Sequence, residues 1–115
     1  MKTVLTISYD SKLLDTRNAL LRSFGIQSID ASSMAEGLHE IQRGGYGLVI
    51  VCYSVPEADQ NQLIAELRKR NSTPALLLRM GAIGGAAKDA RITVIQYRPD
   101  RFVKTVMGLL RSSAA

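Results

Sequence analysis

Two kinds of hydrophobic pattern alternate along the chain. Five short segments rich in aliphatic and β-branched residues predict strands at 3–8, 26–31, 48–52, 75–78 and 93–97. After each of the first three strands and after the fifth, apolar residues recur every three or four positions, which predicts a helix. The first helix begins at Ser11 and carries Leu13, Leu14, Arg17, Leu20, Leu21 and Phe24. Alternating strands and helices predict an α/β fold, with right-handed crossovers placing helices on both faces of a parallel sheet.

Capping residues indicate where the helices begin. Ser33 and Glu36 match a capping box, in which each side chain binds a free backbone N–H of the other's turn. Asp59 is expected to cap the third helix and Asp100 the last one. The carboxylate of such a residue can accept a hydrogen bond from the first turn.

One domain is expected over residues 1–115, because 115 residues is near the commonest domain size of about 100 to 150 residues. The glycine- and alanine-rich stretch 81–90 is expected to hold only a short helix. Residues 112–115 are expected to fray. The run 48–51 is far shorter than a membrane span, so no membrane partner is predicted.

Charge and cysteine content narrow the function classes. The net charge is +5, but the densest basic cluster, residues 68–70, falls in the last turn of a predicted helix, where cations complement the helix dipole. We therefore interpret the basic residues as a solvated surface and expect no nucleic-acid partner. With Cys52 the only cysteine and His39 the only histidine, neither an intramolecular disulfide nor a Cys/His zinc site is expected. A reducing, cytoplasmic location fits this composition.

Candidate chemistry lies at the ends of the predicted strands. In open parallel sheets, ligands bind beyond the carboxyl ends of the strands. The residues at those ends are Ser8, Tyr9, Cys52, Arg79 and Arg98. None of these five carries a carboxylate.

The order and spacing of these features from Lys2 to Leu110 resemble the receiver domain of bacterial two-component response regulators. The strongest match runs from Tyr46 through the apolar run to Pro56 and Asp59, and further matches are the segment 17–25, the segment 31–41, Pro74 and the pair Arg98-Pro99. The resemblance implies a flavodoxin-like, doubly wound (βα)5 sandwich whose parallel five-stranded sheet has the strand order 2-1-3-4-5.

Departures from the family pattern fall on its functional residues. The family's magnesium-binding acidic pair aligns with Ser8 and Tyr9, and its phosphoacceptor aspartate aligns with Cys52. Its hydroxyl residue and its lysine align with Arg79 and Arg98. Because neutral serine and tyrosine are poor magnesium ligands and a thiol cannot form an acyl phosphate, we expect no metal, no cofactor, no catalytic residue and no aspartyl phosphorylation.

The favoured hypothesis is a receiver-like phosphorelay module that is not an enzyme and acts by protein–protein interaction. In the family, signalling commonly uses the face formed by the fourth strand, the helix after it, the fifth strand and the last helix. The resemblance therefore suggests residues 91–110 as the surface for a signalling protein or for a second copy of the chain in a homodimer.

Two other classes of function remain open. An anion-sensing module would use Arg79 and Arg98 with the hydroxyls of Ser8 and Ser54, whereas both arginines could simply lie in solvent. A redox module would use Cys52, whereas a small buried cysteine behaves as an inert hydrophobe. A small enzyme on the same fold is a further class, for which the sequence offers no base and nucleophile pair.

Overall fold

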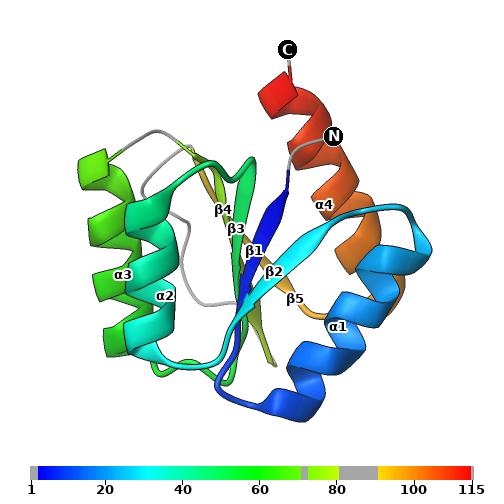
Figure 1. Cartoon of the computed structure of the whole chain (residues 1–115). Coiled ribbons are helices and arrows are strands. Elements are labelled where there is room, and N and C mark those ends of the chain that lie inside the picture. Colours follow the sequence, from blue (N-terminus) through cyan, green and yellow to red (C-terminus); the bar gives the residue numbers. More distant parts are fainter. Residues whose placement is uncertain (1–2, 71–72, 81–90, 115) are drawn as a thin grey trace.

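The computed structural model describes residues 3–70, 73–80 and 91–114 and shows a parallel five-stranded sheet between two helical layers (Figure 1). The sheet order is β2-β1-β3-β4-β5, which confirms the predicted doubly wound α/β fold. The elements are β1 (Val4–Ile7), α1 (Ser11–Ser23), β2 (Ser28–Ala31), α2 (Met34–Arg43), β3 (Leu48–Val51), α3 (Glu57–Arg70), β4 (Ala75–Arg79), β5 (Ile92–Gln96) and α4 (Pro99–Ala114). The short helix expected within 81–90 lies outside the described residues.

The central strands are apolar throughout because helices cover both faces of the sheet. Alternate residues of a strand point to opposite faces. Leu48 and Ile50 of β3 therefore pack in the core beneath α1 and α4, while Val49 and Val51 pack beneath α2 and α3. Figure 1 shows these two helix pairs on opposite sides of the sheet. All four residues of β3 are buried, as expected for a central parallel strand.

The predicted capping box of α2 is half confirmed. The Glu36 amide donates to the Ser33 hydroxyl at 3.1 Å, as expected for an N-cap serine. The Glu36 carboxylate, however, accepts from the amide and hydroxyl of Ser32, at 3.0 and 2.6 Å, instead of from the Ser33 amide. These bonds lower the pKa of Glu36.

Two predicted helix starts were wrong. Helix α3 begins at Glu57 and helix α4 at Pro99, so Asp59 and Asp100 lie in the first turns and do not cap. The Arg98 carbonyl accepts from the Phe102 amide at 2.8 Å. Proline is favoured at the first helical position because its fixed φ suits the helix and its missing N–H would have no partner there.

Two further expectations are settled by side-chain exposure and helix length. Phe24, predicted on the apolar stripe of the first helix, is its C-cap residue and is 51% exposed. The helix ends at Ser23, directly before Phe24, and the ring lies in solvent instead of in the core. Among the described helices, none is both long enough and apolar enough to cross a bilayer.

Candidate functional site

Parallel pairing brings the ends of β1 and β3 together at one edge of the sheet. Ile7 pairs with Val51, and the Cys52 amide donates to the Ile7 carbonyl at 2.9 Å. Ser8 and Cys52 therefore follow directly on adjacent central strands, and both are fully buried. The structure places these two predicted site residues side by side.

Three polar groups form hydrogen bonds at the end of β1: the Ser8 hydroxyl, the Ser54 hydroxyl and the Tyr9 amide. The Ser8 and Ser54 hydroxyls are 2.9 Å apart, and the Tyr9 amide donates to the Ser54 hydroxyl at 3.1 Å. The Ser8 hydroxyl also donates to the Asp10 carbonyl at 3.1 Å. These bonds tie the β1 end to the loop that follows β3, and they occupy the two serine hydroxyls with each other.

Both nearby carboxylates are engaged in structural bonds. Asp10 is the N-cap of α1, and its side chain accepts from the amides of Lys12 and Leu13 at 3.0 and 3.3 Å. Asp59 accepts from the Tyr9 hydroxyl at 2.8 Å. Burial of Tyr9, with the hydrogen bond to Asp59 and its negative charge, raises the pKa of Tyr9 to about 12, so the phenol remains a donor.

The donor set at this edge does not fit a hard divalent cation. Magnesium selects carboxylate and other hard oxygen ligands in octahedral geometry, whereas a thiol and two mutually bonded hydroxyls stand here. Within residues 3–70, 73–80 and 91–114, no three His, Cys, Asp or Glu side chains cluster so that they could hold a metal ion.

Cys52 is an enclosed, protonated thiol. Its side chain belongs to the core beneath α1 and α4 and is 0% exposed. Burial raises the pKa of Cys52 to about 11, although Arg17 and the Ser8 hydroxyl act in the opposite direction. The thiolate is the nucleophilic form, so this environment argues against the redox alternative.

We expect native Cys52 to resist alkylation. At pH 8, a pKa of about 11 leaves roughly one thiol in a thousand ionised, and burial blocks the reagent as well. Iodoacetamide labelling followed by intact mass should be complete within minutes in guanidinium chloride and negligible over the same time in buffer. Rapid labelling of the folded protein would show that the thiol is accessible and would revive the redox hypothesis.

Arg79 and Arg98 lie at the ends of neighbouring strands. Arg79 is the last residue of β4, and its carbonyl accepts from the Tyr97 amide at 3.0 Å. Arg79 is partly buried, and Arg98 is exposed. In the described part of the chain, neither guanidinium hydrogen-bonds to Ser8 or Ser54, so the four-residue anion site remains a prediction.

The structure reveals a buried cation that the sequence reasoning did not single out as a site residue. Arg17 of α1 is only 1% exposed. Its guanidinium carbon lies 4.0 Å from the centroid of the Tyr97 ring and 5.2 Å from that of Tyr53, within cation–π range. It also influences the Cys52 thiol, which places a positive charge at the carboxyl ends of the central strands.

A sequence signal for Arg17 existed. It falls between Leu14 and Leu21 at helical spacing, on the face of α1 where both neighbours are buried. A charged residue on an otherwise apolar stripe is rarely fully buried without a partner. The position of Arg17 on this apolar stripe was visible in the sequence. Its packing against Tyr53 and Tyr97 was not, because those residues lie far along the chain.

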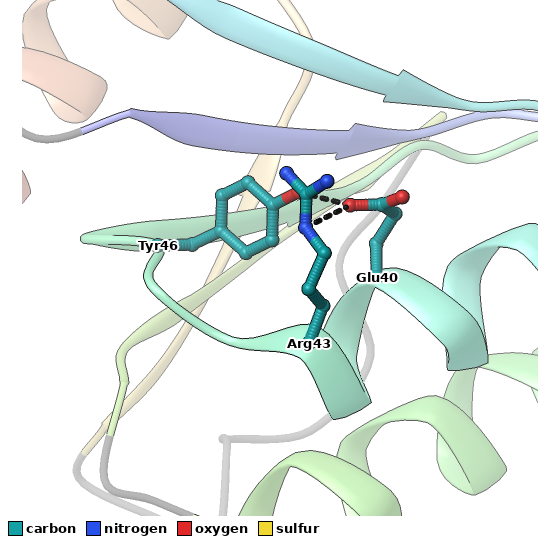
Figure 2. Close-up of polar contacts among 3 residues, drawn as sticks. All are labelled: Glu40, Arg43 and Tyr46. Atoms are coloured by element: carbon teal, nitrogen blue, oxygen red, sulfur yellow. Dashed lines mark hydrogen bonds and ion pairs between the residues drawn. The ribbon is translucent and has the colours of Figure 1, made fainter.

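A second polar cluster lies at the opposite end of β3. Figure 2 shows Glu40 and Arg43 of α2 beside Tyr46: the Tyr46 hydroxyl donates to Glu40, and Arg43 Nε lies 3.4 Å from the same carboxylate. Burial and Glu40 raise the pKa of Tyr46 to about 12. This cluster joins the end of α2 to the start of β3. We interpret it as structural because it lies away from the carboxyl ends of the strands.

The fold defined by this geometry is that of receiver domains. The chain is similar to the receiver domain of a Francisella response regulator, with 21% identity, coverage of 98% of this chain and 99% of that one, and a TM-score of 0.79. It is also similar to response regulator TrrA of Thermotoga maritima in complex with Mg²⁺ and BeF, with 22% identity, coverage of 95% and 99%, and a TM-score of 0.74.

A third similar structure is the receiver domain of a Pseudomonas aeruginosa sensor histidine kinase, solved with magnesium in its active-site cleft. It shares 14% identity, with coverage of 96% of this chain and 98% of that one and a TM-score of 0.77. No protein-family model matches this sequence, and no curated protein does. At these identities the likeness establishes the receiver fold and leaves the chemistry of the site to its own residues.

Proposed function

We propose that this chain is a receiver-like signalling module of the two-component type that works by binding a protein partner and is not phosphorylated on an aspartate. One observation carries the proposal: a buried thiol, that of Cys52, stands directly after β3 at the carboxyl edge of the sheet. In a doubly wound sheet this edge is where chemistry is carried out. The resemblance aligns the same position with the family's phosphoacceptor.

The neighbouring groups support this proposal. Forming an acyl phosphate requires a carboxylate nucleophile, and phosphoryl transfer relies on a cation to neutralise the developing charge. Here the strand end offers a thiol, the Ser8 and Ser54 hydroxyls bond each other, and Asp59 is held by Tyr9. The module is accordingly proposed to act by binding, without catalysis.

The proposed partner surface comprises β5 and α4. β5 is an edge strand of the sheet, and Arg98, Arg101 and Lys104 are exposed at its end and along α4. The partner is proposed to be a signalling protein or a second copy of the chain. A cytoplasmic location is part of the proposal and rests on the single cysteine and the family resemblance.

We expect the protein to remain unphosphorylated in acetyl phosphate and Mg²⁺, because the residue directly after β3 is Cys52, which carries a thiol and not a carboxylate. Intact mass spectrometry should show no addition of a phosphoryl group. An NMR titration with Mg²⁺ and then beryllofluoride should give no saturable shift at the Ser8 and Cys52 amides.

A receiver domain with an intact aspartate, treated in parallel, is the positive control. A stoichiometric mass increase, or a saturable shift at these amides, would contradict the proposed loss of phosphorylation. A variant with Cys52→Asp distinguishes two causes of inactivity: if it is phosphorylated, the missing carboxylate is the main block, and if not, the surrounding groups also prevent the reaction.

The partner surface is tested by charge reversal. In cells expressing the tagged chain, cross-linked complexes should be lost with the double variant Arg101→Glu/Lys104→Glu and kept with Lys69→Glu, an exposed control on α3. Equal loss with both, or with neither, would refute the assignment of the surface to α4.

A further inference from the structure

The guanidinium of Arg17 is buried with its bonding capacity mostly unused. Its Nη1 donates to the Leu13 carbonyl at 3.3 Å, whereas Nε and Nη2, both buried, have no hydrogen-bond partner among the described residues. No described Asp or Glu forms an ion pair with it. Leaving charged N–H groups unbonded in a core is costly, and the two tyrosine faces compensate the charge without accepting these hydrogens.

The two unpartnered nitrogens lie on the same edge of the guanidinium plane. Nε–H and one Nη2–H are parallel donors, and this edge matches the two oxygens of a carboxylate in a bidentate pair. The bond from Nη1 to Leu13 uses the other side of the group. Arg17 thus presents a free fork within the core, and its charge acts on the nearby Cys52 thiol.

We propose that Arg17 binds a small monocarboxylate, of the size of formate or acetate, at the carboxyl ends of β1 and β3. Burial decides the charge of the ligand: a monovalent anion forms a neutral pair with one guanidinium, whereas a divalent phosphate would leave a net charge in the core. The planar carboxylate also fits the planar fork. This site differs from the Arg79 and Arg98 pair, which lies nearer the surface.

Entry to the site requires a side-chain movement. Tyr53 and Tyr97 pack on the guanidinium and are themselves partly exposed, so they lie between Arg17 and solvent. The site is independent of the proposed signalling function, because neither needs the other to be correct.

The test is a titration with sodium formate and sodium acetate, replacing sodium chloride at constant ionic strength. The readouts are the Arg17 Nε–Hε resonance in a nitrogen-15 spectrum and the thermal unfolding midpoint. We expect a saturable shift of that resonance with a parallel rise in the midpoint. Arg17→Lys, which keeps the charge but loses the fork, should weaken binding by roughly tenfold or more.

Surface arginines supply the matched controls. Arg79→Met and Arg98→Met should bind formate as the unmodified protein does. If Arg17→Lys does not fold, as judged by its amide spectrum, Arg17→Met replaces it and should abolish the saturable response. The proposal is overturned if the unmodified protein shows no saturable shift, if the Arg17 variants bind equally well, if a surface variant alone loses binding, or if phosphate binds more tightly than formate.

Discussion

Replacing Phe102 with alanine is expected to lower the free energy of unfolding by about 3–5 kcal/mol, the usual cost of truncating a buried aromatic residue. Phe102 is 0% exposed and is among the largest fully buried side chains. Its ring lies 5.6 Å from that of Tyr97 at an interplanar angle of 55°, so truncation removes core volume and an aromatic contact. Urea denaturation followed by circular dichroism measures the change.

Phe24→Ala is the matched control for this loss. The same side chain is removed, but Phe24 is 51% exposed at the end of α1 and the change should lie within about 1 kcal/mol. Similar losses for both variants would show that α4 does not pack on the sheet as described. The contrast therefore tests the placement of the proposed partner helix.

Arg17→Met is expected to raise the free energy of unfolding by about 1–3 kcal/mol in a chloride buffer without carboxylates, since apolar replacement of buried charge is often stabilising. Methionine keeps much of the length of the arginine and removes the two unbonded nitrogens. Two cation–π contacts and the bond to Leu13 are lost, which reduces the gain. Urea denaturation of both proteins provides the comparison.

Arg101→Met controls for a general effect of removing a positive charge from a chain of net charge +5. Arg101 is exposed on α4, and its replacement should change stability by no more than about 0.5 kcal/mol. A loss of stability in Arg17→Met would mean that the guanidinium is fully compensated in the folded protein. Adding formate should narrow the difference between Arg17→Met and the unmodified protein, because only the latter gains a bound anion.

The chain has the receiver fold, and a thiol and hydroxyl groups stand at the ends of its central strands. The sheet and its two cores depend on apolar strand residues such as Ile50 and Val51, which contribute nothing to the charge of the site. Among the residues at the strand ends, Cys52 belongs to one of these cores, but the apolar strand residues make up most of the sheet's share of both. A shared fold is therefore compatible with the proposed absence of aspartyl phosphorylation and with the proposed carboxylate ligand.

Several features were predictable from the sequence because they depend on neighbouring residues. The fully apolar stretch 48–51 predicts a buried parallel strand, and Ser33 before the second helix predicts its cap. Neither Ser8 nor Cys52 carries a carboxylate, which follows from the residue types alone and does not depend on conformation. Helix starts at Glu57 and Pro99 were missed, because aspartate is favoured both as a cap and in the first turn, and proline occurs in turns as well as at the first helical position.

The sequence by itself determined the alternation of strands and helices and the absence of a carboxylate at position 52. The resemblance also implied the strand order, whereas only the tertiary structure decided that Ser8 bonds to Ser54 and that Arg17 packs against Tyr53 and Tyr97. The reason is physical: periodicity records which face of an element is apolar, whereas the burial of one charged side chain depends on residues that distant segments of the chain bring against it.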